Sequence, residues 1–201
     1  MRFIGITGGV GAGKSELLAY IKRHYLCEIY LADEVAHLVK AKGTPCYRRL
    51  TELLGEDILR ADGEIDKRAM AERIFGDGEL LERVNGIIHP AVREYLLQRL
   101  EAARSNPKVE LFFVEAALLI EAGYKGLADE LWYVHAGEAI RRRRLEESRQ
   151  YSPEKIMRIM ENQLSEEQFR EHCDFVIDNS GRLEDSFRQI DKKLEDFSWR
   201  D

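Results

Sequence analysis

Short apolar runs alternate with helical patterns along most of the chain. The run from Phe3 to Thr7 contains β-branched residues and is closed by two glycines, which is typical of a buried parallel strand. From Ser15 to Tyr25, apolar residues recur at helical spacing. Because strands alternate with helices, we expect an α/β fold with a five-stranded parallel sheet covered by helices on both faces. The four further strands are predicted at residues 29–31, 111–114, 131–134 and 175–177.

The stretch of residues 45–105 differs because it contains no convincing strand. Asp66 is placed to cap one helix and Asp77 to start another. The second helix should end at His89-Pro90, since the residue before a proline is biased away from the α region, and a new helix should start at Pro90. The stretch is therefore predicted as an all-helical insertion between the second and third strands.

Two helical patterns lie in the last third of the chain. Residues 139–171 are predicted to be helical, with a break near Ser152-Pro153, where a serine precedes a proline. Residues 183–194 carry the apolar spacing of a closing amphipathic helix.

Composition narrows the class of protein. The chain has 201 residues, of which 44% are hydrophobic and 34% charged, enough for one α/β domain with a small insertion. The net charge of −6 argues against a dedicated binder of nucleic acid or of an anionic membrane. No apolar run nears the roughly 18 residues of a membrane span. We therefore expect neither nucleic acid nor membrane as a partner.

The cysteines and the first residues favour a cytoplasmic protein. The three cysteines are far apart and form no C-x-x-C pair, so we expect reduced thiols, with no zinc site and no disulfide frame. The N-terminus runs directly into the first predicted strand, and no signal peptide is expected.

The strongest motif follows the first strand and matches the phosphate-binding P-loop, G-x-x-x-x-G-K-[ST]. Its glycines let backbone N–H groups point at phosphate oxygens, and the following helix adds its positive end. Lys14 supplies a charge for the β- and γ-phosphates of ATP, and Ser15 a hydroxyl for Mg²⁺. The predicted nucleotide-binding residues are Gly8, Gly9, Val10, Gly11, Ala12, Gly13, Lys14 and Ser15.

Among P-loop proteins, the sequence favours a kinase for small acceptors. It contains neither the N-K-x-D motif of GTPases nor a transporter-type signature. Asp33 follows the second strand, at the sheet edge where ligands bind in such folds. Its carboxylate could accept the proton of an attacking hydroxyl or help to hold Mg²⁺ through water, or it could simply cap the next helix.

Two further features carry open alternatives. Glu115 ends the third strand and is either a ligand of Mg²⁺ or a polar strand terminus. Four consecutive arginines, 141–144, precede Arg149. One or two could face inward and stabilise the transferring phosphoryl group, or the run could form a solvated face paired with Glu146 and Glu147.

An ordered set of segments resembles the dephospho-CoA kinase family along essentially the whole chain. The P-loop alone is shared by many families, whereas the ordered set is much more specific. The set comprises the P-loop with Thr7 before it, Ala32-Asp33 followed by Ala36, Arg68 to Phe75, His89-Pro90, Leu118 to Glu121, Gln163, and Asp174 to Gly181.

The resemblance implies an activity and a domain plan. The activity is transfer of the γ-phosphate of ATP to the 3′-hydroxyl of dephospho-CoA, which completes coenzyme A, with ATP as co-substrate and Mg²⁺. The plan is a P-loop kinase core at residues 1–44, 106–136 and 173–201, a helical acceptor domain at 45–105, and a helical lid at 137–172.

The resemblance also implies roles for single residues. Catalysis would rest on Asp33, Lys14, Arg144 and Arg149, the last two as lid arginines. Glu16 and Asn179 would join the nucleotide site, with Asn179 near the adenine. His89 could equally be a structural helix breaker. The residues implied to hold the acceptor are Asp33, His89, Leu118, Leu119 and Glu121.

Some positions depart from the family pattern. Leu31 stands where the family usually has Asp, Ala117 where it usually has Pro, and Glu16 where Thr is common. An extra residue before Arg149 would rotate that side chain by roughly 100° on an unbroken helix. The alternatives are a P-loop kinase for another nucleotide-like acceptor, or a non-catalytic ATP-binding relative. We expect a monomer or a weak homo-oligomer.

Overall fold

The computed structural model describes residues 1–120 and 123–195. Its contacts divide the chain into two compact units, one formed by Met1–Ile29 with Asn106–Asp201 and the other by Tyr30–Ser105. The predicted insertion began at residue 45, whereas the contacts already assign residues 30–44 to the second unit. The domain boundaries implied by the resemblance stay a prediction.

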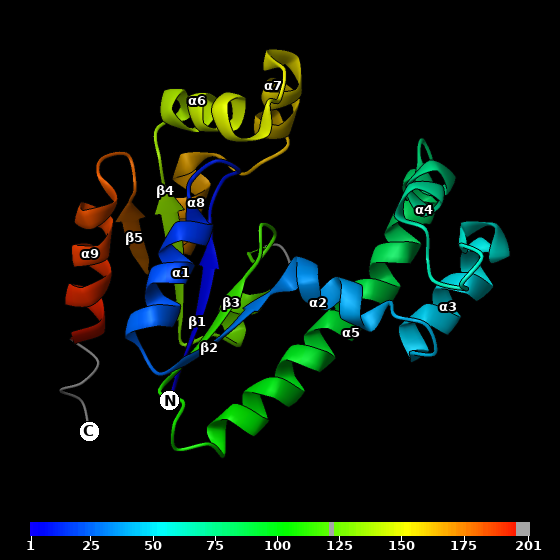
Figure 1. The fold of residues 1–201 in the computed structure, drawn as a ribbon, viewed down its shortest axis with the longest axis horizontal. Coiled ribbons are helices and arrows are strands. Elements are labelled where there is room, and N and C mark those ends of the chain that lie inside the picture. The colour runs from blue at the N-terminus through cyan, green and yellow to red at the C-terminus, as the bar shows by residue number, and fades with distance from the viewer. Residues whose placement is uncertain (121–122, 196–201) are drawn as a thin grey trace. The chain divides into compact units, whose positions relative to one another are not determined.

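The first unit is built on a five-stranded parallel sheet (Figure 1). The strand order is β2-β3-β1-β4-β5, and β1 lies between β3 and β4. The interiors of the central strands β1, β3 and β4 are apolar and buried, as expected for strands covered on both faces, and their polar residues stand at the strand ends. All five strands were predicted, and the α/β fold is confirmed. Their bounds are β1 Arg2–Thr7, β2 Cys27–Leu31, β3 Leu111–Glu115, β4 Glu130–His135 and β5 Phe175–Asp178.

Helices cover both faces of this sheet. Glu130 and Tyr133 of β4 point to opposite faces, since side chains alternate along a strand. Phe169 of α8 stacks on Tyr133 with ring centroids 4.6 Å apart, while Lys193 of α9 pairs with Glu130 at 3.0 Å. The helices of this unit are α1 Lys14–His24, α6 Glu138–Arg149, α7 Pro153–Glu161, α8 Glu166–His172, α9 Leu183–Glu195 and the short η2 Tyr124–Gly126.

Parallel pairing brings the carboxyl ends of the strands to one edge. Ile6 pairs with Glu115 of β3, and Thr7 with Tyr133 of β4. His135 pairs with Asp178 at the end of β5. The segment after β1 therefore begins beside the ends of its two neighbouring strands, where this class of sheet binds ligands.

The second unit is helical, as predicted, and has its own core. Asp66 caps α4 by accepting hydrogen bonds from the backbone N–H groups of Arg68 and Ala69. Cys46, Leu50 and Leu54 of α3 are buried in this core with residues of α4 and α5. Its elements are α2 Ala32–Val39, α3 Pro45–Leu54, η1 Glu56–Ile58, α4 Lys67–Ile74 and α5 Gly78–Arg104.

The predicted helix break at His89-Pro90 is wrong, because α5 runs unbroken through Pro90. Ile87 before the proline and Val92 after it are both buried, and α5 packs on α2 and α3 within this unit. Burying one continuous apolar stripe outweighs the lost N–H group of Pro90 and the local bias of the residue before it. Pro90 itself is exposed.

The helical pattern of residues 139–171 contains one break more than the sequence predicted. Ser152 caps α7, as expected. A second interruption separates α7 from α8, where Ser165 and Gln168 form a capping box, each side chain bonding to the other's backbone N–H group. The S-x-x-Q spacing is visible in the sequence and could have revealed this helix start.

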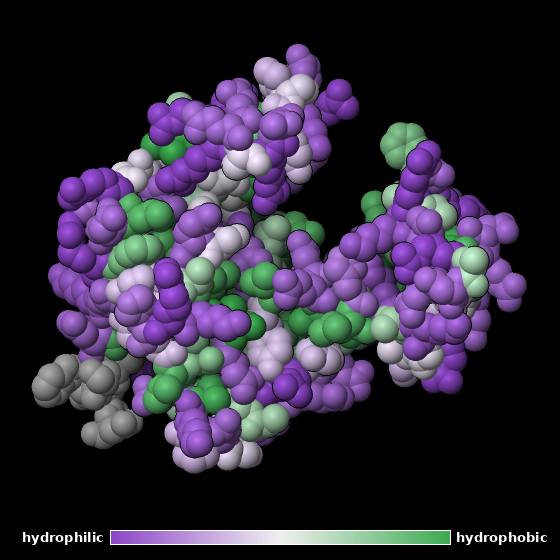
Figure 2. Space-filling model, in the orientation of Figure 1, coloured by the Kyte–Doolittle hydropathy of each residue, from purple (hydrophilic) through white to green (hydrophobic). Residues whose placement is uncertain are grey.

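Most of the face seen in Figure 2 is hydrophilic, in keeping with the high content of charged residues. Among the described residues, no helix combines the length and the apolar character that crossing a membrane requires.

Replacing Pro90 with Ala should stabilise the second unit by about 2 kcal/mol. Alanine restores a hydrogen bond to the Gly86 carbonyl and removes the clash of the proline ring, which together stabilise the helix by about 3 kcal/mol. It also gives the unfolded chain more conformational entropy, which lowers the stability by about 1 kcal/mol. Calorimetric unfolding measures the change. Glu82→Ala, at an exposed position of the same helix, is the control and should leave the midpoint nearly unchanged. A lower midpoint for Pro90→Ala would contradict the packing explanation.

Candidate active site

The P-loop connects β1 to α1, and three of its glycines, Gly8, Gly11 and Gly13, have positive φ angles at which a side chain would be strained. Gly13 has φ of 90°, in the left-handed region, and precedes the first residue of α1. A Cβ added to Gly13 would collide with the carboxamide of Asn179, and one added to Gly9 with the guanidinium of Arg141. Side chains from other elements thus lie directly against the loop.

Lys14 is the first residue of α1, and its side chain folds back onto the P-loop. Its Nζ donates to the Gly8 carbonyl at 2.7 Å and lies 3.4 Å from Glu115 Oε1. Burial lowers the pKa of Lys14, while the Glu115 carboxylate opposes that shift. Both side chains are largely shielded from water, so the ammonium has lost hydration that phosphate oxygens would replace.

Arg144 and Asn179 bind backbone carbonyl groups of the loop. Arg144 Nη1 donates to the Ala12 carbonyl at 3.2 Å, and Nη2 to the Asn179 carbonyl at 2.9 Å. Asn179 is fully buried; its Nδ2 donates to the Ala12 carbonyl at 2.7 Å, and its Oδ1 accepts from Ser186 at 2.9 Å. These bonds favour a supporting role, and the predicted contacts of Asn179 with adenine and of Arg144 with the phosphoryl group stay predictions.

Arg141 belongs to the arginine run noted in the sequence but was given no individual role, and it binds the middle of the loop. Its Nε donates to the Val10 carbonyl at 3.0 Å and its Nη2 to Gln163 Oε1 at 2.7 Å. Gln163 Oε1 also accepts from the Val10 N–H at 3.3 Å, so both polar groups of Val10 are engaged. Burial lowers the pKa of Arg141. The sequence signal that could have revealed this role is the spacing of Arg141 and Arg144, which lie three residues apart and therefore share one face of the helix.

Arg149 is the last residue of α6, which runs unbroken from Arg144, so the condition for the expected rotation is met. Gln150 follows in the left-handed conformation with φ of 51°. The Arg149 guanidinium lies 6.0 Å from the centre of the Tyr151 ring. Arg149 is also among the smaller causes of the lowered pKa of Lys14, after burial. Its role as a lid arginine stays a prediction.

The predicted magnesium ligands lie near this loop. Ser15 is exposed in the first turn of α1, with Glu16 beside it. Glu115 is paired with Lys14. Among the described residues, no group of three or more His, Cys, Asp or Glu side chains could hold a metal. A Mg²⁺ carried on nucleotide phosphates needs only one or two protein ligands, which Ser15 and Glu115 could supply.

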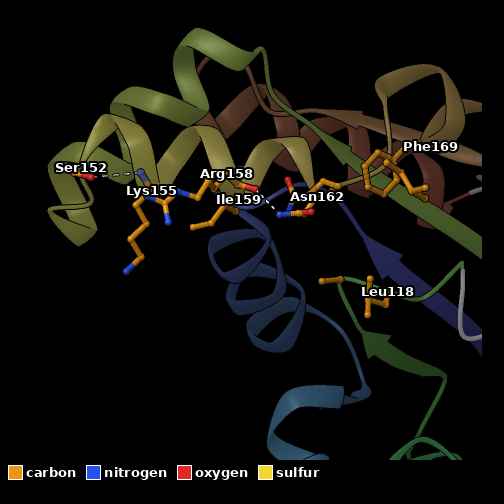
Figure 3. A pocket seen from close by; sticks show the side chains of 10 residues that line it. Leu118, Ser152, Lys155, Arg158, Ile159, Asn162 and Phe169 are labelled. Carbon is orange, nitrogen blue, oxygen red and sulfur yellow. Dashed lines mark hydrogen bonds between the residues drawn. The ribbon is translucent and has the colours of Figure 1, made fainter. Parts of the chain in front are cut away.

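Leu118 and Leu119, in the loop after β3, lie in different environments. Leu118 is 53% exposed and lines a pocket with Gln163, across from the side chains of α7 (Figure 3), whereas Leu119 is fully buried. Leu119 lies over Gly5, where an added Cβ would collide with it, so its side chain packs on the sheet. Glu121, the third acceptor residue predicted here, lies outside the described residues.

Asp33 and His89 belong to the second unit. Asp33 is exposed in the first turn of α2, whose N-cap is Leu31, so the alternative that Asp33 caps this helix is wrong. Its charge still favours the helix N-terminus. His89 is exposed within α5 and breaks no helix. The roles of both residues toward an acceptor stay predictions.

Comparison with known proteins decides the family. The model of the dephospho-CoA kinase family matches residues 2–185. The chain belongs to the dephospho-CoA kinase family. Its predicted membership, and with it the assignment as an ATP-dependent kinase, is confirmed.

Individual relatives agree with the family model. A dephospho-CoA kinase of Dehalococcoides mccartyi is 33% identical over 186 residues, which cover 92% of each chain. One of Moorella thermoacetica is 41% identical over 147 residues, covering 72% of this chain and 68% of that protein. A solved structure from Thermus thermophilus, 30% identical, covers 97% of both chains with a TM-score of 0.80.

Replacing Arg141 with Ala should weaken ATP binding roughly tenfold to a hundredfold, because it removes two charge-assisted hydrogen bonds that hold the loop around Val10. Titration calorimetry with ATP measures the loss. Arg142→Ala is the matched control, since Arg142 is the next residue of α6 and its guanidinium pairs with Glu138 on the same helix. Equal losses in the two variants would show that charge alone, and not loop support, is responsible.

Proposed function

We propose that this protein transfers the γ-phosphate of ATP to the 3′-hydroxyl of the ribose of dephospho-CoA, giving coenzyme A and ADP. The observation that carries the proposal is the P-loop with Lys14, whose backbone is held by side chains of other elements, in a chain whose family match spans residues 2–185. Cytoplasmic localisation and a monomeric or weakly oligomeric state stay predictions.

The loop supplies most of the electrostatic stabilisation. The backbone N–H groups of Gly11, Gly13 and Lys14 and the N-terminus of α1 would surround the β- and γ-phosphates. Lys14 would exchange its bonds to the Gly8 carbonyl and Glu115 for phosphate oxygens as the nucleotide binds. Mg²⁺ would be held by Ser15, with Glu115 close by, and neutralises phosphate charge when bound.

Asp33 is proposed as the group that acts on the acceptor. Its carboxylate would accept a hydrogen bond from the 3′-hydroxyl and take its proton as the oxygen attacks phosphorus. The O–P bond to the acceptor forms as the bond from the γ-phosphorus to the bridging oxygen breaks, and ADP leaves. The transfer is direct, so no covalent enzyme intermediate is required.

Release of ADP should depend on dephospho-CoA. In a coupled assay with Mg·ATP, dephospho-CoA should sustain turnover and yield coenzyme A, while AMP and adenosine should support little, since they lack most of the acceptor. ATP binding without turnover on any acceptor would favour the non-catalytic alternative. Turnover with AMP in preference to dephospho-CoA would favour a kinase for another nucleotide.

Asp33→Asn should lower kcat by roughly a hundredfold to ten thousandfold, the usual contribution of a general base, while the KM for ATP changes little. Glu34→Gln is the matched control, because Glu34 is the neighbouring exposed acid in the same helical turn. Steady-state kinetics with both substrates varied separates the two parameters. Unchanged kcat in Asp33→Asn would exclude the proton-acceptor role.

A further inference from the structure

Asn179 and Ser186 are fully buried polar residues that are hydrogen-bonded to each other. Asn179 follows β5, and Ser186 lies in the first turn of α9, the helix that packs on β5 and on α1 (Figure 1). All of these elements belong to the first unit. Burying a polar group is unfavourable unless its hydrogen bonds are satisfied, so the partner of each polar atom in this pair matters.

The two ends of the Asn179 carboxamide face different partners. Its Nδ2 donates to the Ala12 carbonyl of the P-loop at 2.7 Å, and its Oδ1 accepts from the Ser186 hydroxyl at 2.9 Å. The oxygen and the nitrogen of a carboxamide are nearly equal in size, so hydrogen-bond partners decide which way the group points. Only the orientation with Nδ2 toward Ala12 satisfies both partners, because a half-turn would set Oδ1 against the Ala12 carbonyl oxygen.

The hydroxyl proton of Ser186 is available to Asn179. Ser186 Oγ lies 2.9 Å from Asn179 Oδ1 and 3.0 Å from the Asp178 carbonyl oxygen, and a hydroxyl has one proton to donate. Gln189 Nε2 also donates to the Asp178 carbonyl, at 3.0 Å. That carbonyl therefore keeps a donor without Ser186. Within the described part of the chain, Ser186 is the donor that reaches Asn179 Oδ1.

We propose that Ser186 is a positioning residue for the nucleotide site, which it affects through Asn179 by keeping Nδ2 turned toward the Ala12 carbonyl. The inference rests on the proposed function only in taking ATP as the ligand of the loop. Without the Ser186 hydroxyl, Asn179 Oδ1 would be buried with no donor, and the orientation that holds Ala12 would lose its advantage. The loop would be less ordered before ATP binds, and ordering it on binding would lower the affinity.

A purely structural role for Ser186 would have a different signature. In that case the hydroxyl would only attach α9 to β5 through the Asp178 carbonyl. The same helix is also attached to α1, because the Tyr25 hydroxyl, just after α1, donates to Asp191 Oδ1 at 2.7 Å. Tyr25→Phe removes that hydroxyl alone and leaves every contact of Asn179 in place. It is therefore the matched control, since each variant loses one hydroxyl that binds α9 to a neighbouring element.

Ser186→Ala should weaken ATP binding about fivefold to fiftyfold in titration calorimetry, the range expected when a buried acceptor loses its donor. In steady-state kinetics the KM for ATP should rise, while kcat and the KM for dephospho-CoA each change less than about twofold, the pattern of lost ground-state binding. Tyr25→Phe should lower the midpoint of thermal unfolding and leave the ATP affinity within about twofold of the wild type, because it contacts no group of the loop.

A double-mutant cycle shows whether Ser186 acts through Asn179. On an Asn179→Ala background, Ser186→Ala should change the ATP affinity less than about twofold, because the group that Ser186 positions is absent. An unchanged ATP affinity in Ser186→Ala, an equal loss on both backgrounds, or an equal loss in Tyr25→Phe would overturn the inference. A wild type that binds ATP but never phosphorylates dephospho-CoA would instead refute the proposed function, and the calorimetric test would still apply because it requires no turnover.

Discussion

The active site depends on one constraint, which is that the backbone N–H groups of a short glycine-rich loop must stay turned toward the phosphates. A chain of glycines has no conformational preference strong enough to do this alone. In this protein, side chains from other elements donate hydrogen bonds to carbonyl groups of the loop and so restrict its conformation. Arg141 holds the carbonyl of Val10, and Arg144 and Asn179 hold that of Ala12. With the carbonyls fixed, the loop can keep its shape, and the catalytic geometry can be preorganised.

These supports come from parts of the chain that meet only in the folded sheet. Arg141 and Arg144 lie on α6, which follows β4, and Asn179 follows β5. The parallel order β1-β4-β5 brings both segments to the edge where the P-loop begins. Two of the three supports, Arg141 and Arg144, are cationic. Burial lowers the pKa of Arg141 and also that of Lys14 in the loop itself. The site therefore concentrates partly dehydrated positive charge, which suits a highly anionic substrate.

The features predictable from sequence were those fixed by local physics. Short apolar runs predicted the five strands, the P-loop motif placed Lys14 and Ser15 at the junction of a strand and a helix, and the capping position of Asp66 predicted the helix that follows it. Features decided by tertiary packing were missed. The helix through Pro90 is stabilised by apolar contacts that no local rule contains, and the role of Arg141 depends on which face of α6 meets the loop. The pocket beside Gln163 was hidden for the same reason, since its walls are far apart in sequence.

The support of the loop by Arg141 and Gln163 is tested most directly by a double-mutant cycle on ATP affinity. Wild type, Arg141→Ala, Gln163→Ala and the double variant would be titrated with ATP by calorimetry. Because Gln163 Oε1 accepts from both Arg141 and the Val10 N–H, the two losses should be non-additive, with an interaction energy of about 1 kcal/mol or more. Additivity within about 0.5 kcal/mol would contradict the account, since it would mean that the two side chains act on the loop independently.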